Sequence, residues 1–558
     1  MAGSPWWKDK VAYQIYPRSF MDSNGDGVGD LNGITEKLDY LRDLGVDLVW
    51  LSPVYRSPMD DGGYDISDYE DINPMFGTME DMDRLIREAG KRGIRLLMDL
   101  VVNHCSDEHP WFQKALKEPD SEEAGYFWFV RSGDRPPNNW ASMFGGSAWE
   151  PVGDGRWYMH LFSRKQPDLN WENPALRKKV YEMIRFWLDK GLGGFRIDAI
   201  THIKKMPGLP SGPAERPDGL VGCHAYTRCI DGIGEFLTEL RKETFDRYEC
   251  ITVAEAAGVP PEQLKDYVGE NGYFSTMFDF SYAEPYNYGN GWHTAKNPGE
   301  WDFRKWRDAL YLSQTETQKI GRGAVFLENH DYPRACQKFV PEKDHGPAVQ
   351  KMLGQLFFYL HGIPFIYQGE ELGMTNPRFT SIDQIDDIST KNHYRIALAD
   401  GLTPEEALPL ICRYSRDNAR VPFPWNGKEN GGFCAPGAKP WLPVHQDYRK
   451  VNAEAEAKDP DSVLAFYKEM ISIRKSADYG PTVVDGRFDP ILRRYGKLIA
   501  YTRTGDRRLA VICSLSDRPR VLRLPFVPKK ILQKSADGER LSGNELFLLP
   551  YQSLLMEF

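Results

Sequence analysis

The sequence predicts a (β/α)8 barrel with an inserted subdomain after its third strand and a C-terminal all-β sandwich domain. Three observations support this prediction: eight short apolar runs between residues 11 and 371, helical patterns between several of them, and a change to short alternating runs from about residue 480. The chain has 558 residues, 41% hydrophobic and 27% charged, so it is globular in composition and long enough for roughly two to four domains.

The eight apolar runs have the character of buried parallel strands. Several are hydrophobic at almost every position, as expected when helices cover both faces of a sheet. The expected strands are 11–20, 46–55, 95–104, 194–200, 251–255, 276–280, 324–331 and 363–368. Apolar residues at helical spacing in 35–44 and 176–188 place helices between strands. Eight parallel strands with intervening helices predict a closed barrel.

Long stretches interrupt the barrel pattern. Residues 105–172 are rich in Trp, Gly, Pro and Asn and far exceed the usual βα loop of about 2–6 residues, which predicts an inserted subdomain. The barrel would comprise 1–104 and 173–479, with a second excursion at about 372–455 after the eighth strand. Short alternating runs with turns such as Thr504-Gly505-Asp506 predict an all-β domain over 480–558.

Charge and cysteine usage exclude several classes of protein. Seventy basic against eighty acidic residues give a net charge of −10 with no basic stripe, so no nucleic-acid partner is expected. The start lacks the apolar core of a secretion signal, and the longest mostly apolar stretch, 353–367, is too short and too interrupted to span a membrane. Eight cysteines without a CxxC pair suit a reducing cytoplasm. We expect a cytoplasmic monomer or weak homo-oligomer.

Polar residues at the predicted strand ends mark the expected active site, because barrel enzymes build their sites there. A lone aspartate at a strand end is more often a helix cap or an ion-pair partner. Several carboxylates converging on one cavity with an arginine and two histidines are better explained as a site, because an unpaired buried carboxylate is costly. The residues are Asp99, Asn103, His104, Arg196, Asp198, Glu255, His330 and Asp331.

Several segments resemble the α-amylase superfamily of glycoside hydrolases. They are DLVVNH at 99–104, GFRID at 194–198, TVAEAAGV around Glu255 and ENHD at 328–331, and QPDLN at 166–170 is similar to a motif of the oligo-1,6-glucosidase and α-glucosidase subgroup. The resemblance covers essentially the whole chain. It implies a retaining, exo-acting α-glucosidase that releases the terminal non-reducing glucosyl residue of short α-1,6- or α-1,4-linked oligosaccharides.

The resemblance also implies residue roles. Asp198 would be the nucleophile, Glu255 the general acid/base and Asp331 a third carboxylate that braces the substrate. A retaining glycosidase needs one ionised carboxylate and one that is protonated at rest. Arg196, on the same strand face as Asp198, would keep that aspartate ionised.

The same resemblance implies a set of sugar-binding residues. His104 and His330 would donate to sugar hydroxyls, Tyr64 and Asp65 would stack on the sugar and bind its hydroxyls, and Arg420 would close the pocket together with Asp65. Aromatics of the insertion could also stack on sugars, although core packing is the better explanation for any one of them. They are Trp111, Phe112, Phe127, Trp128, Trp140 and Phe144.

The loop at 22–30 is a candidate metal site. It places oxygen-bearing residues at alternate positions with glycines between them, which suits Ca²⁺ or Mg²⁺. It is no EF-hand, because Gly33 stands where the bidentate Glu belongs, and a turn that binds nothing is the alternative. The resemblance implies structural calcium; no organic cofactor is expected. The candidate ligands are Asp22, Asn24, Asp26, Val28 and Asp30.

Three alternatives share the scaffold. A sucrose isomerase or glucosyltransferase would carry an Arg-Leu-Asp-Arg-Asp motif where this chain has NPGEWDF at 297–303. A phosphorylated-disaccharide hydrolase could use Lys204 and Lys205, although a lysine pair is usually a solvated face. Non-enzymatic members are membrane-anchored and lack catalytic carboxylates, which does not hold here. Ala199 after Asp198 leads us to expect activity on both linkages.

Overall fold

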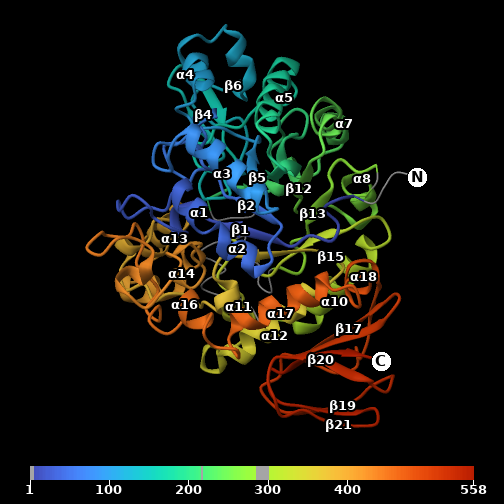
Figure 1. The fold of residues 1–558 in the computed structure, drawn as a ribbon. Coiled ribbons are helices and arrows are strands. Elements are labelled where there is room, and N and C mark those ends of the chain that lie inside the picture. Colours follow the sequence, from blue (N-terminus) through green and yellow to red (C-terminus); the bar gives the residue numbers. More distant parts are fainter. Residues whose placement is uncertain (1–4, 215–217, 270, 284–300) are drawn as a thin grey trace.

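A closed barrel of eight parallel strands forms the centre of the computed structural model, which describes residues 5–214, 218–269, 271–283 and 301–558 (Figure 1). Each barrel strand overlaps one of the predicted apolar runs, so the prediction of the barrel is confirmed. In order around the barrel they are β1 (Ala12–Ile15), β2 (Leu48–Leu51), β5 (Arg95–Val101), β10 (Gly194–Asp198), β12 (Ile251–Glu255), β13 (Thr276–Phe278), β14 (Gly323–Val325) and β15 (Gly362–Tyr367).

Helices surround the barrel, and their buried stripes match the sequence pattern. In α5, the residues Leu176, Val180, Ile184 and Leu188 are buried, which are the positions expected from the helical spacing. Side-chain caps fix several starts, because they satisfy backbone N–H groups that have no partner in the helix; Thr78 and Asp81, for example, form a capping box at α3. The helices are α1 (Leu31–Glu36), α2 (Leu38–Leu44), α3 (Met79–Lys91), α5 (Pro174–Asp189), α7 (Ile233–Glu243), α10 (Phe303–Thr317) and α12 (Pro347–Phe358).

After β5 the chain leaves the barrel and builds a small separate sheet, seen at the top of Figure 1. Helix α4 (Pro110–Lys117) is followed by an antiparallel sheet of β6 (Phe129–Arg131), β9 (Arg156–Met159) and β8 (Trp149–Pro151). The short β7 (Trp140–Ala141) pairs instead with β11 (Val221–Gly222), which lies in the loop after β10. This pairing ties the insertion to the segment that follows the predicted nucleophile.

The second excursion and the C-terminal sheets follow β15. The excursion contains α13 (Ile388–Ala399), α14 (Pro404–Cys412), α15 (Asp417–Arg420) and α16 (Ala453–Glu456), and α17 (Val463–Lys475) then packs on α12. Residues 480–485 form α18, so the C-terminal strands begin at Arg487. One sheet is β16 (Arg487–Pro490), β17 (Leu498–Thr504), β18 (Arg508–Ser514), β23 (Ser553–Glu557) and β20 (Lys530–Lys534); the other is β19 (Arg520–Arg523), β22 (Glu545–Leu548) and β21 (Arg540–Ser542).

Apolar side chains fill both domains. The two C-terminal sheets enclose Leu498, Ile512, Leu522, Leu546 and Leu554. The barrel interior is packed with residues such as Trp50, Leu97, Val253, Phe278 and Phe365. The barrel is therefore a solid core that supports a site at one end. In the described part of the chain, no helix has both the length and the apolar character needed to cross a bilayer.

Gly194 at the start of β10 should be irreplaceable. Its φ is 144°, and a methyl group there would overlap the carbonyl oxygen of Ile251 on the adjacent strand. We expect Gly194→Ala to lower the free energy of unfolding by about 3 kcal/mol, from backbone strain and overpacking together. Gly90→Ala is the matched control, because Gly90 lies in α3 with nothing within 4 Å of the added carbon. It should be neutral or stabilising by about 0.5–1 kcal/mol. Equal melting temperatures for the two variants would contradict the expected backbone strain at position 194.

Candidate active site

Arg196 lies at the centre of three carboxylates at the carboxyl end of the barrel. Its Nη1 is 2.7 Å from Asp99 Oδ1 and 2.7 Å from Asp198 Oδ1. Its Nη2 contacts Glu255 Oε2. The four residues come from the neighbouring strands β5, β10 and β12, and Arg196 is directly in register with Asp99. The side chain of Arg196 is 2% exposed, so a single buried cation contacts three acidic side chains.

Burial and charge separate the pKa values of the two presumed catalytic acids. Burial raises the pKa of Glu255 to about 8; Arg196 opposes the rise, and Asp198 and Asp331 contribute to it. Burial also raises the pKa of Asp198 to about 6, with Arg196 opposing the rise. Near neutral pH Asp198 is therefore ionised and Glu255 is protonated. This is the pair of states that a nucleophile and a general acid require.

Asp331 differs from both, because arginines surround it. Arg420 Nη2 lies 3.0 Å and Arg416 Nη1 3.5 Å from Asp331 Oδ1. Although burial acts in the opposite direction, His330 and these two arginines lower the pKa of Asp331 to about 2. About a third of its side chain is exposed, so this permanent carboxylate can face a bound substrate.

Tyr64 and His330 join the carboxylates into one network. The Tyr64 hydroxyl donates to Asp99 Oδ2 at 2.9 Å and lies 2.6 Å from His330 Nε2. The two rings are stacked, with centroids 5.4 Å apart. His104 lies 3.2 Å from the amide nitrogen of Gln166, whose N–H donates to Asp61 Oδ2 at 3.1 Å. The structure thus gathers Tyr64, Arg196 and His330 around the strand-end carboxylates, and His104 lies beside Gln166.

Asp65 does not take the predicted place beside Arg420. It is fully buried, and its oxygens accept from Ser57 Oγ and from the backbone N–H groups of Asp60 and Asp61. It therefore closes the turn that carries it, a turn that contains two glycines with positive φ. Arg420 instead contacts Asp331.

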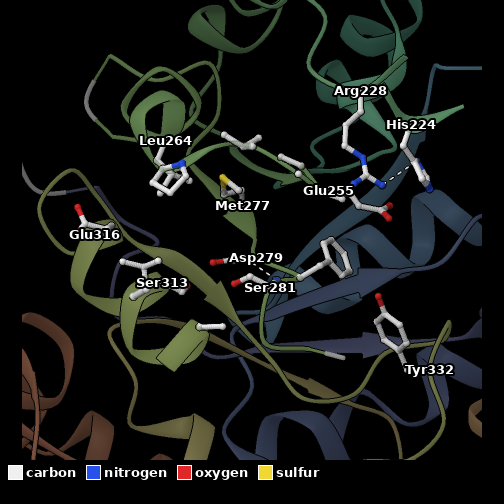
Figure 2. A pocket seen from close by; sticks show the side chains of 18 of the residues that line it. His224, Arg228, Glu255, Leu264, Met277, Asp279, Ser281, Ser313, Glu316 and Tyr332 are labelled. Atoms are coloured by element: carbon white, nitrogen blue, oxygen red, sulfur yellow. Dashed lines mark hydrogen bonds between the residues drawn. The ribbon is translucent and has the colours of Figure 1, made fainter. Parts of the chain in front are cut away.

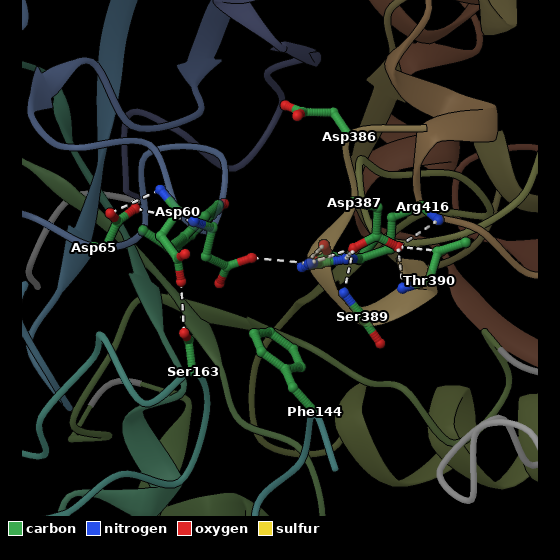
Figure 3. Close-up of polar contacts among 12 residues, drawn as sticks. Asp60, Asp65, Phe144, Ser163, Asp386, Asp387, Ser389, Thr390 and Arg416 are labelled. Atoms are coloured by element: carbon green, nitrogen blue, oxygen red, sulfur yellow. Dashed lines mark hydrogen bonds and ion pairs between the residues drawn. The ribbon is translucent and has the colours of Figure 1, made fainter. Parts of the chain in front are cut away.

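The aspartate that meets an arginine of the excursion is Asp61, whose Oδ1 lies 2.8 Å from Arg416 Nη2. Arg416 also contacts Asp387 at 2.7 Å, and its guanidinium lies 5.0 Å from the ring centre of Phe144 (Figure 3). Sequence reasoning missed Asp61 and Arg416. Asp61 is three positions before Tyr64 and Arg416 is four before Arg420, but this spacing alone does not tell which side chain turns toward the partner.

Two cavities adjoin this network of polar side chains. One, of about 780 Å³, begins at Glu255 and Tyr332 and extends to Leu312 and Glu316 (Figure 2). The other, of about 650 Å³, lies between the insertion and the excursion, where Phe144, Phe162 and Ser163 face Asn392. Of the insertion aromatics singled out from the sequence, Phe112, Phe127 and Trp140 are buried in cores, whereas Phe144 lines the second cavity.

Lys204 and Lys205 are committed to ion pairs. Lys205 Nζ is fully buried, 2.6 Å from Asp168 Oδ2, and donates to Asn103 Oδ1 at 3.0 Å. Lys204 Nζ lies 2.8 Å from Glu172 Oε1. Lys205 therefore links the QPDLN segment to the residues after β5, and the two lysines do not face a ligand together.

The side chains of the loop at 22–30 accept hydrogen bonds from the loop's own backbone. The Asp22 carboxylate accepts hydrogen bonds from the backbone N–H groups of Asn24, Gly25 and Gly27. The Asn24 side chain accepts one from the N–H of Asp26, and the Asp26 side chain accepts one from the N–H of Val28. Asp30 accepts from Ser23 and caps α1 through Gly33. Within the described ranges no group of three or more His, Cys, Asp or Glu residues is arranged to hold a metal. The ligands offered are nevertheless hard oxygens. Those that accept one hydrogen bond each, and so keep a lone pair for a cation, are Asp22 Oδ2, Asn24 Oδ1, Asp26 Oδ1 and Asp30 Oδ2.

The fold and the carboxylates define a barrel-type glycoside hydrolase, and comparison with known proteins agrees. Residues 14–482 match the family described as alpha amylase, catalytic domain. The oligo-1,6-glucosidase of Parageobacillus thermoglucosidasius is 43% identical over 563 aligned residues, which cover 98% of each chain. The chain belongs to the α-amylase superfamily of glycoside hydrolases, in its oligo-1,6-glucosidase and α-glucosidase subgroup.

Solved structures are similar over the full length. The trehalose-6-phosphate hydrolase of Bacillus licheniformis has a TM-score of 0.90 at 39% identity, covering 99% of this chain and 100% of that one. The trehalulose synthase of Pseudomonas mesoacidophila has a TM-score of 0.92 at 38% identity, covering 100% of both chains. One scaffold therefore serves enzymes with different named reactions.

We expect a bell-shaped pH dependence of kcat/KM. Below about pH 6 the Asp99–Asp198 pair gains a proton and the nucleophile is lost; above about pH 8 Glu255 loses the proton that it must donate. Initial rates from about pH 4 to about pH 10 measure both limbs. Glu255→Gln should remove the alkaline limb and keep the acid one. An alkaline limb unchanged in that variant would assign it to another group.

Proposed function

We propose that the protein is a retaining, exo-acting α-glucosidase that removes the terminal non-reducing glucosyl residue from short oligosaccharides. The observation that carries the proposal is the pair Asp198 and Glu255, bound to one guanidinium and held in opposite protonation states. Carboxylates that share one guanidinium lie close together. This favours the spacing of about 5–5.5 Å found in retaining enzymes over the wider spacing of inverting ones.

In the proposed reaction Asp198 attacks the anomeric carbon while Glu255 protonates the leaving oxygen. A glucosyl ester on Asp198 forms, and Glu255, now ionised, removes a proton from the water that hydrolyses the ester. Arg196 stabilises the carboxylate that leaves in this second step. Asp331, always ionised, and His330 would hold sugar hydroxyls during both steps.

Exo action is supported by the cross-link between Asp61 and Arg416. Arg416 belongs to the excursion, where it contacts Asp387, and its ion pair with Asp61 joins the excursion to the loop at 57–65. Phe144 lies against its guanidinium. We propose that this cross-link closes the site behind the terminal sugar, so that only chain ends are bound. The small Ala199, whose N–H lies 3.4 Å from Glu255 Oε2, supports activity on both α-1,6 and α-1,4 linkages.

A phosphorylated disaccharide is the second candidate substrate, because a relative is named trehalose-6-phosphate hydrolase. The charges beside Glu255 disfavour it. Asp279 and Glu316 line the same cavity, with Arg228 as its one formally charged cation among the described lining residues. Sucrose isomerisation is the third candidate; residues 297–300 of the segment that argues against it lie outside the described residues.

We also propose a reducing, cytoplasmic setting and a monomer or weak homo-oligomer. All eight cysteines are unpaired, which is what a reducing compartment maintains. The acidic net charge of −10 supports the absence of a nucleic-acid partner.

The function is tested by incubating the purified protein with maltose, isomaltose, trehalose, sucrose and their 6-phosphates. We expect glucose from the unphosphorylated α-glucosides and α-glucose as the first anomer seen by NMR, because two displacements retain configuration. Asp198→Asn is the control: it should fold normally and release none, since an amide is a poor nucleophile. Sugar release from the 6-phosphates alone would show that the substrate is a phosphorylated disaccharide. β-Glucose as the first anomer would refute a retaining mechanism.

Glu255→Gln should separate substrates by leaving group. An aryl glucoside with an acidic phenol needs no proton from the enzyme, so its glucosylation step should be largely spared. Natural disaccharides should lose on the order of a hundredfold or more in the same step. Pre-steady-state release of the phenol measures glucosylation alone. Equal losses for both substrates would show that Glu255 is not the acid.

We further propose that the loop at 22–30 binds a structural Ca²⁺, with Mg²⁺ as the second candidate. Asp22, Asn24, Asp26 and Asp30 would contribute side-chain oxygens and Val28 its carbonyl. The loop is held against residues 435–440, because a Cβ at Gly27 would overlap the carbonyl of Lys439. Such an ion would stabilise the folded state and take no part in the chemistry, since Asp198 already supplies the nucleophile.

Chelation should therefore lower the melting temperature and spare activity measured well below it. The double variant Asp22→Ala, Asp26→Ala should melt early and be insensitive to added Ca²⁺. A matched control, Asp120→Ala with Asp134→Ala, removes two exposed acids elsewhere and should keep the calcium response. A calcium response that survives in the loop variant would place the ion elsewhere.

A further inference from the structure

Gln14, in the middle of β1, contacts the active site from inside the barrel. It is 1% exposed. Its amide nitrogen donates to Ser52 Oγ at 3.2 Å and lies 2.8 Å from His330 Nδ1. The two hydrogens of the amide group therefore have two partners, one directly after the neighbouring strand β2 and one in the ENHD segment.

The contacts on the opposite side of the His330 ring indicate which nitrogen carries the proton. Nε2 lies 2.6 Å from the Tyr64 hydroxyl and 3.2 Å from Asp331 Oδ2. The hydroxyl has one hydrogen and donates it to Asp99, an ionised carboxylate that also accepts from Arg196 and Trp50. The Tyr64 oxygen can then only accept from His330, so Nε2 must carry the hydrogen.

The surroundings of His330 keep the ring neutral. Burial lowers its pKa to about 3; Asp331 opposes this, while Arg420, Arg196 and Arg416 add to it. The rings of Tyr16, Trp50 and Tyr64 pack around the imidazole, and Arg420 Nε donates to the His330 carbonyl. A neutral ring with hydrogen on Nε2 has a bare lone pair on Nδ1, which needs a donor.

We infer that Gln14 is a positioning residue whose amide N–H fixes His330 in the tautomer with hydrogen on Nε2. The hydrogen on Nε2 is then presented to Tyr64, Asp331 and the sugar side of the site. The opposite tautomer would turn a bare nitrogen toward the Asp331 carboxylate and draw the Tyr64 hydrogen away from Asp99. The structural part of this inference stands alone; its catalytic consequence rests on the proposed function.

Gln14→Glu tests the assignment, because a carboxylate of the same shape accepts where the amide donates. The variant should place a proton on Nδ1, and kcat/KM for an α-glucoside should fall on the order of tenfold to hundredfold, the usual effect of losing one buried hydrogen bond. Gln14→Met, which removes the donor without adding charge, should give a mixture of tautomers and a smaller loss. Gln355→Glu is the control: Gln355 is a fully buried glutamine on α12 whose amide donates to Gln533, and this variant should change neither property.

Two-bond ¹H–¹⁵N spectra of histidine-labelled protein report the tautomer directly, with His330→Gln identifying the resonances. The wild type should show Nδ1 as the unprotonated nitrogen and Nε2 as the protonated one. A protonated Nδ1 in the wild type, or a tautomer unchanged in both Gln14 variants, would overturn the inference. The spectra need no substrate, so a wild-type protein that released no glucose would refute the proposed function and leave the tautomer result intact.

Discussion

The buried guanidinium of Arg196 is the constraint on which the active site depends. It is almost without solvent contact and neutralises acids on three adjacent strands. Removing Arg196 from this cluster would leave buried carboxylates uncompensated in a medium of low dielectric, which is strongly destabilising. The strand register that brings Asp99 opposite Arg196 therefore fixes the electrostatics of the site as well as its shape.

The same cluster explains how two carboxylates a few ångströms apart can have different roles. One guanidinium cannot fully stabilise three negative charges, so the acid with the least support holds its proton. Glu255 is the last strand residue of β12, with more solvent access than Asp198, yet burial and two neighbouring acids raise its pKa to about 8. Asp331 is the opposite case, because two arginines from outside the barrel surround it.

Loops far apart in sequence complete the site around this rigid centre. The insertion contributes Phe144 and Phe162, the turn before Tyr64 contributes Asp61, and the excursion after β15 contributes Arg416 and Arg420. These parts are joined by polar contacts between side chains more than 300 residues apart, such as Asp61 with Arg416. The chemistry is thus a property of the barrel, whereas the shape of the pocket is a property of the loops.

The sequence by itself determined the barrel and the acids at its strand ends. Repeated apolar runs of strand length with helical patterns between them are typical of buried parallel strands, and acids placed at their carboxyl ends converge when the sheet closes. Tertiary structure alone decided that Asp61 rather than Asp65 meets an arginine, that this arginine is Arg416, and that Lys205 is bound to Asp168. Which of two nearby side chains turns toward a partner depends on the path of a glycine turn and on residues hundreds of positions away. The spacing of residues along a short segment encodes neither the path of the turn nor those distant contacts.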